Sequence, residues 1–117
     1  MELSEITYAS ATPIDGYGPG FFRVGGEVLS GPVCLTAQKA FQWNGFDDIG
    51  IVEKLAGGID VLLVGTGESM AIVPATFREV CESNGIGIEP MASPSACRTF
   101  NVLLAEGRRV AAALLPV

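Results

Sequence analysis

The apolar positions along the chain fall into short runs separated by glycine and proline. The clearest run, Ile59 to Val64, is mostly β-branched and aliphatic, as expected for a strand that is covered on both faces. It is the predicted central strand. Three further short runs predict strands, and the last of them is expected to close the sheet. These runs are Val33–Leu35, Ile86–Glu89 and Val110–Leu115.

A β-hairpin is predicted near the N-terminus. The stretch from Phe21 to Leu29 holds two β-favouring runs separated by Gly25-Gly26, a pattern typical of a two-residue turn. The segment before it, Ile14 to Gly20, contains three glycines and one proline and is predicted to be irregular. Residues 1–13 are expected to form a flexible segment, which leaves residues 14–117 as one domain.

Start and stop signals predict three helices. Asp47 or Asp48 can cap a short helix that ends at Gly57-Gly58, because a carboxylate accepts hydrogen bonds from the first free amides. Pro74 suits the first turn of a second helix, which Asn84-Gly85 would end.

The third helix has the clearest boundaries. Ser93 followed by Pro94 is typical of an N-cap and the first helical position, and Gly107 supplies the stop. Helices therefore alternate with strands after the hairpin, which favours a mixed sheet flanked by helices. The predicted fold class is a single compact α/β domain, with a central mixed β-sheet and an N-terminal β-hairpin region.

Charge and hydropathy limit the kinds of partner that the chain is expected to bind. Thirteen acidic against seven basic residues give a net charge of −6, which would repel a phosphate backbone, so we expect no nucleic-acid partner. No apolar run approaches the roughly 20 residues of a membrane-spanning helix. The first residues carry Glu2 and Glu5 without a basic or apolar block, which predicts a cytoplasmic protein.

The chain contains no histidine, the commonest general base and metal ligand. Three widely separated cysteines argue against a disulfide framework and a CxxC clip. We therefore predict no metal, no cofactor and no catalytic residue. Cys97 lies beside Arg98 near a helix start, which could lower its pKa, but the pattern favours a buried, inert thiol.

Two helix-start regions could form one candidate pocket. The loop after the central strand and the start of the third helix both offer backbone amides, which can hold a carboxylate, phosphate or sulfate. The alternative is a sharp turn and an ordinary capped helix. Asn101, inside the helix, is expected to bind a neighbouring loop. The candidate pocket residues are Gly65, Thr66, Gly67, Ser95, Cys97, Arg98, Thr99 and Asn101.

Several motifs together resemble a known family. They are Gly31-Pro32, Trp43, Val64-Gly65-Thr66-Gly67, Pro94-Ser95-Ala96-Cys97-Arg98-Thr99-Phe100-Asn101 and Glu106-Gly107-Arg108. In order and spacing the chain resembles the domain of unknown function family 498, over about residues 14 to 115. That family includes a mitochondrial complex I assembly factor and an adipogenesis-associated protein. The resemblance implies a compact α/β fold and assigns no catalytic residue.

Two functional hypotheses follow. The first is a non-enzymatic binding or assembly module with a protein partner. The alternative is a small-molecule, anion-binding protein or enzyme that uses the Gly65-Gly67 loop and the Ser95-Asn101 helix start, with Cys97 or Glu68 assisting. A homo-oligomer is a third possibility, and the oligomeric state stays open.

Overall fold

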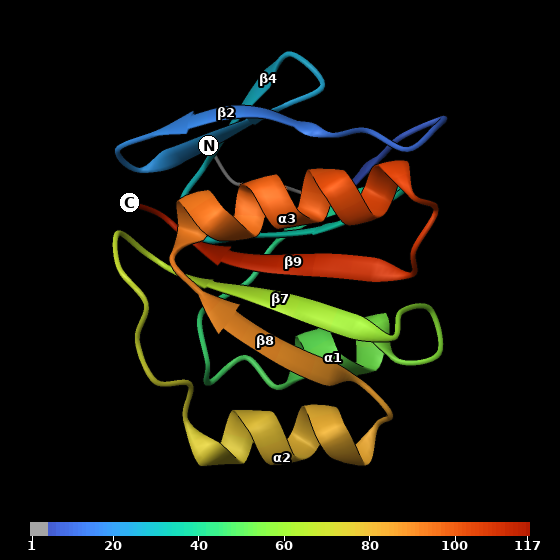
Figure 1. Cartoon of the computed structure of the whole chain (residues 1–117), viewed down its shortest axis with the longest axis vertical. Helices are drawn as coiled ribbons and strands as arrows, with labels where there is room; N and C mark the ends of the chain where they lie inside the picture. Colours follow the sequence, from blue (N-terminus) through green and yellow to red (C-terminus); the bar gives the residue numbers. More distant parts are fainter. Residues whose placement is uncertain (1–4) are drawn as a thin grey trace.

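The computed structural model describes residues 5–117, which form an α/β domain with two sheets and three helices (Figure 1). The α/β class with a mixed sheet is therefore confirmed. The second sheet lies beyond α3, at the end of the molecule opposite α2. The elements in chain order are β1 (Ile6–Thr7), β2 (Ile14–Gly18), β3 (Phe21–Val24), β4 (Glu27–Ser30), β5 (Val33–Thr36), β6 (Lys39–Gln42), α1 (Gly50–Leu55), β7 (Val61–Thr66), α2 (Ala75–Ser83), β8 (Gly87–Met91), α3 (Ser93–Ala105) and β9 (Val110–Leu115).

The main sheet has six strands in the order β1-β6-β5-β9-β7-β8. β7 is parallel to both β8 and β9, whereas β5 is antiparallel to β6 and β9. The strand predicted over Val110–Leu115 is confirmed as β9. It lies in the interior of the sheet, so the prediction that it closes the sheet is wrong. Its three consecutive alanines, all fully buried, leave room for layers to pack closely on both faces.

Side chains that alternate along the strands form a core on each face of the main sheet. Leu63 and Ala112 face α3 and the second sheet, in one cluster. Leu62 and Ala113 face α1 and α2, in the other. The second cluster also contains Trp43, whose indole NH donates to the backbone oxygen of Leu114 at 3.1 Å. Trp43 is therefore a core residue.

The predicted hairpin forms β3 and β4, and Gly25 and Gly26 at its turn have φ of 59° and 81°. The prediction that Ile14 to Gly20 is irregular is wrong, because most of this segment forms β2, which pairs with β3 as the third strand of the second sheet. Of the glycines from Gly16 to Gly20, only Gly20 has positive φ. Glycine permits a turn without requiring one, and a register shift between Ile14 and Gly16 accommodates the strand.

The helices begin without the predicted side-chain caps. The N-cap of α1 is Ile49, and the Asp48 carboxylate accepts instead from the backbone NH of Asn44 at 2.9 Å. The N-cap of α3 is Ala92, so Ser93 is already helical and its hydroxyl is free for other contacts. The predicted stop of α2 is confirmed by Gly85, which follows the C-cap with φ of 76°.

Two strands of the main sheet carried no recognised signal. The sequence pattern predicts no strand over Lys39–Gln42, which form β6 and pair with β5. β1 lies within the segment expected to be flexible, and Ile6 and Thr7 pair with Ala40 and Lys39 of β6. β1 has two residues, and β6 has two adjacent apolar residues between polar ones, so neither shows the alternation that predicts a strand. The first four residues of that expected segment lie outside the described residues.

Candidate functional site

The Gly65-Gly67 loop and the start of α3 lie side by side, because the neighbouring strands β7 and β8 are parallel and their carboxyl ends lie together. The backbone NH of Ser93 donates to the Gly67 oxygen at 2.8 Å, and the Gly67 NH donates to Ser93 Oγ at 2.9 Å. Ser93 Oγ in turn donates to the backbone oxygen of Leu115. We call this junction of Gly65, Thr66, Gly67 and Ser93 the seam.

Gly65 allows the seam to close. A methyl group added there would lie 2.7 Å from Ser93 Oγ, 2.8 Å from Leu114 Cδ2 and 3.0 Å from Ser93 Cα. These separations are well inside van der Waals contact, so only glycine fits between the sheet and α3. The glycine therefore has a packing role, whatever else the loop does.

Thr66 is also engaged by its own loop. Its hydroxyl accepts from the Ala71 NH at 2.9 Å and lies 2.7 Å from the Ser69 oxygen and 3.2 Å from the Met91 oxygen. A hydroxyl has one proton to donate, so the shorter contact with Ser69 is the favoured bond. Thr66 thus shapes the loop between β7 and α2.

The remaining predicted pocket residues divide between two other places on α3. Ser95 and Arg98 lie at the outer surface, with the guanidinium 3.3 Å from Ser95 Oγ. Asn101 instead accepts from the Ile14 NH and donates to the Ile14 oxygen, both at 2.8 Å. It ties α3 to β2, as expected of a helical asparagine with a backbone partner. Thr99 is half-buried.

The cysteines are held as neutral thiols. Burial raises the pKa of Cys97 to about 11, and the neighbouring Arg98 only partly opposes this. Burial likewise raises the pKa of Cys81 to about 11 and that of Cys34 still further. A thiolate is the reactive form of cysteine, so this environment disfavours nucleophilic chemistry at neutral pH.

Within residues 5–117 the acidic and thiol side chains form no group of three that could hold a metal ion. The same residues include no helix that is long and apolar enough to cross a membrane. At the seam the Gly67 NH, the Ser93 NH and the Ser93 hydroxyl are all engaged in hydrogen bonds within the protein. Anion binding by the residues of the predicted pocket stays a prediction.

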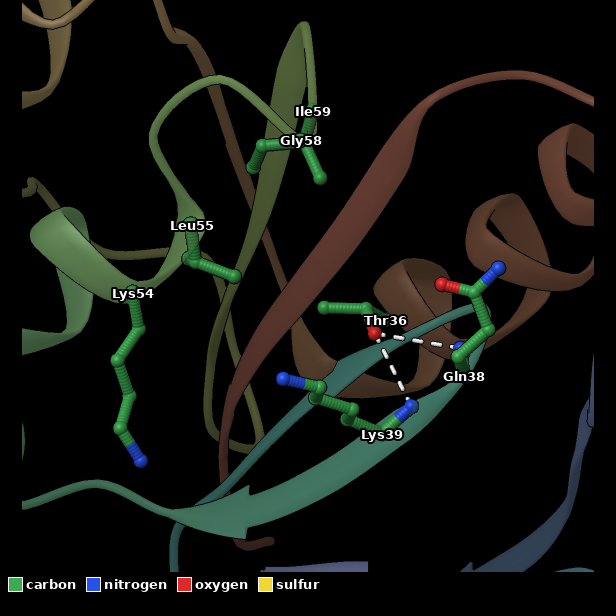
Figure 2. Close-up of a pocket in the computed structure, with 7 residues that line it drawn as sticks. All are labelled: Thr36, Gln38, Lys39, Lys54, Leu55, Gly58 and Ile59. Carbon is green, nitrogen blue, oxygen red and sulfur yellow. Dashed lines mark hydrogen bonds between the residues drawn. The ribbon is translucent and has the colours of Figure 1, made fainter. Parts of the chain in front are cut away.

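A second polar region, which was not predicted from the sequence, lies at the β1–β6 edge of the main sheet. Lys39 of β6 and Lys54 of α1 line a cavity of about 180 Å³ (Figure 2). The Glu5 carboxylate lies 3.3 Å from the Lys39 ammonium and 3.4 Å from that of Lys54. These ion pairs hold the pKa of Glu5 below its ordinary value, mainly through Lys39. No local spacing connects three residues so far apart in the chain.

The protein is a layered α/β domain. The polar groups of Thr66, Gly67 and Ser93 at the seam form hydrogen bonds within this domain. The family model described as a protein of unknown function (DUF498/DUF598) matches residues 14–115. The chain belongs to this family, so the resemblance seen in the motifs is confirmed.

Named relatives extend over nearly the whole chain. An uncharacterized protein of Rhodobacter capsulatus is 50% identical over 117 residues, which cover 100% of this chain and 94% of that protein. Human NADH dehydrogenase [ubiquinone] 1 alpha subcomplex assembly factor 3 is 33% identical over 123 residues, covering 99% of this chain and 67% of that protein.

A solved structure has the same fold. The crystal structure described as an outer membrane protein from Bartonella henselae matches with a TM-score of 0.82 and 34% identity. The match covers 92% of this chain and 97% of that one.

Proposed function

We propose that this chain is a non-enzymatic binding module that takes part in assembling a multisubunit protein complex. A respiratory NADH dehydrogenase is the first partner to test, because human assembly factor 3 aligns with 99% of this chain. That alignment is the observation that carries the proposal. Transfer of a role between relatives is an analogy and has to be tested directly.

The environment of the reactive residue types supports a non-enzymatic role. Cys97 is 4% exposed, and its raised pKa keeps the thiol protonated. Ser93 is fully buried, and its hydroxyl donates to a backbone oxygen, so it has no base to activate it as a nucleophile. The surroundings of Cys97 and Ser93 therefore favour roles in packing and hydrogen bonding.

The loop between β7 and α2 offers an exposed apolar surface for a partner. Ile72 is 91% exposed and Met70 is 62% exposed. Apolar side chains of this size lose contact with water when a partner covers them, which favours association. The loop runs from the end of β7 to α2 (Figure 1), so a partner could reach it without disturbing the core.

Affinity capture tests the proposal. The tagged full chain is incubated with detergent-solubilised respiratory membranes, and bound proteins are quantified by mass spectrometry. We expect NADH dehydrogenase subunits to be enriched, and Ile72→Asp to reduce that enrichment without changing the unfolding midpoint. Val102→Asp is the matched control, since Val102 is 57% exposed on α3. Equal recovery with an unrelated acidic protein would contradict the assembly role.

Anion binding at the start of α3 is the second candidate. It is favoured by the Ser95 hydroxyl and the Arg98 guanidinium, which lie together at the surface beside the positive end of a 13-residue helix. Phosphate or sulfate should then raise the melting temperature of the wild-type chain more than that of Arg98→Ala. Equal shifts in the two proteins would exclude this site.

A further inference from the structure

Within residues 5–117, β1 covers the β6 edge of the main sheet through few contacts. β1 pairs with just two residues of β6, Lys39 and Ala40, and the pairing continues as one bond from the Tyr8 NH to the Gln38 oxygen at 2.7 Å. An edge strand whose neighbour is so short is a template for another extended chain.

A carboxylate already occupies a defined place beside this edge. The Lys39 and Lys54 ammonium groups, which we call the lysine cradle, bracket the Glu5 carboxylate through separate oxygens. Lys54 Nζ also lies 4.3 Å from the centre of the Phe41 ring, a cation–π contact that favours this position of the ammonium group. Figure 2 shows the two lysines reaching the cavity from β6 and α1.

The charges around the cradle favour an acidic occupant. The cavity at the cradle shares lining residues with a second cavity, which lies at the strand ends just before β7 and β9. Together the two cavities contain four of the chain's seven basic residues, Lys39, Lys54, Arg108 and Arg109. Arg109 pairs with Asp60 at 3.4 Å, and Asp48 lines the adjoining cavity next to Lys54. Basic groups are thus concentrated here on a chain with a net charge of −6.

The Glu5 carboxylate is held only weakly in the lysine cradle. Glu5 is 39% exposed, and the two lysines are 51% and 53% exposed, so water and salt screen both ion pairs. Tyr8, which follows β1, has a buried hydroxyl with no hydrogen-bond partner in the described part of the chain. A two-residue strand with such contacts is suited to exchange with a competing segment.

We propose that the β6 edge is a docking site for an extended acidic segment of a protein partner. The segment pairs with β6 in place of β1 and puts a carboxylate into the lysine cradle in exchange for Glu5. Backbone hydrogen bonds supply affinity, and the cradle supplies selectivity for the acidic residue. The proposal concerns a different surface from the exposed β7–α2 loop and does not depend on the assembly role.

Fluorescence anisotropy with a labelled peptide tests the exchange. The probe has the sequence of residues 2–8, with its N-terminus acetylated, because this sequence carries Glu5 and the β1 residues Ile6 and Thr7. We expect the full chain carrying Glu5→Gln to bind the probe at least about threefold more tightly than the wild type, since the intramolecular competitor is weakened. Adding Lys39→Ala and Lys54→Ala should abolish that gain, as should a probe with glutamine at its fourth position.

Glu53→Gln is the matched control, because it removes an exposed charge of α1 without altering the cradle, and it should bind as the wild type does. Circular dichroism verifies that each variant is folded. No detectable binding to Glu5→Gln, or binding that ignores the lysine substitutions, would overturn the proposal. A dimer of the wild-type chain that Lys54→Ala dissociates would show that a second copy takes the site, and would overturn the assignment to a different partner.

Discussion

The seam and the β1–β6 edge are opposites in how they use polar groups. At the seam, Gly67 and Ser93 bond to each other inside the protein, and a single methyl group at Gly65 would not fit. At the edge, Glu5 meets two exposed lysines, and within residues 5–117 two residue pairs and the Tyr8–Gln38 bond hold the strand.

The difference shows that a polar motif and a polar binding surface need not coincide. Glycine, serine and threonine at the seam satisfy the backbone where a helix meets a sheet, because buried amides and carbonyls are costly to leave unpaired. The groups at the edge are exposed and cost little to rearrange. Partner binding is easier to accommodate where native contacts are weak.

The largest expected effect concerns thiol reactivity. Because the pKa of Cys97 is raised from 9.0 to about 11, its thiolate population near neutral pH should be about 100-fold below that of a free thiol. We expect labelling by iodoacetamide to be slower in the folded chain by at least that factor, and to reach the ordinary rate in concentrated guanidinium chloride. Rapid labelling of Cys97 in the folded chain would revive the nucleophile hypothesis.

Gly65→Ala should cause the largest loss of stability among the seam substitutions. The new methyl group would overlap both Ser93 and Leu114, so we expect the free energy of unfolding to fall by about 3 kcal/mol in urea titrations. Gly16→Ala is the control, since nothing lies within 4 Å of its added methyl group. Equal, small losses in the two variants would mean that the seam is not tightly packed.

Asn101→Ala should have a smaller effect on the same scale. It removes both hydrogen bonds to Ile14, and we expect a loss of about 2 kcal/mol. Asn84→Ala is the comparison, because Asn84 makes one exposed bond to the Val80 oxygen and should cost only about 0.5 kcal/mol. A loss at position 101 no greater than at position 84 would refute the proposed tie between α3 and β2.

The edge should show the smallest effect, and one that depends on pH. Since Lys39 and Lys54 lower the pKa of Glu5 from 4.5, the contact stabilises the folded state above that value and is lost as pH falls through the lower folded-state pKa. We expect the NMR signals of β1 and β6 to shift over this acidic range while those of the seam stay fixed. In Glu5→Gln the edge should not respond to pH, and a response as large as the wild type's would implicate another group.

Much of the fold could be predicted from the sequence, because hydrophobic runs and stop signals are local. Ile59 to Val64 predicted an interior strand, and Gly25-Gly26 predicted a turn. β1 was missed because it has two residues, and β6 because its two apolar residues are adjacent and do not alternate with polar ones. The place of β9 within the sheet was missed because the local sequence pattern does not determine which distant strands pair.

The site was predicted only in part for the same reason. Parallel β7 and β8 bring Gly67 and Ser93 together, as the two helix-start signals suggested. The sequence could not show that they would bond to each other, or that Glu5 would lie between Lys39 and Lys54. Both facts depend on tertiary geometry.

Amide hydrogen exchange measured by NMR tests the contrast between the two regions most directly. The amides of Gly67 and Tyr8 are both hydrogen-bonded, the first at the seam and the second beside β1. Local opening sets the exchange rate of each, so we predict that Gly67 exchanges only with global unfolding and Tyr8 much faster. Exchange of Gly67 as fast as that of Tyr8 would contradict the closed seam.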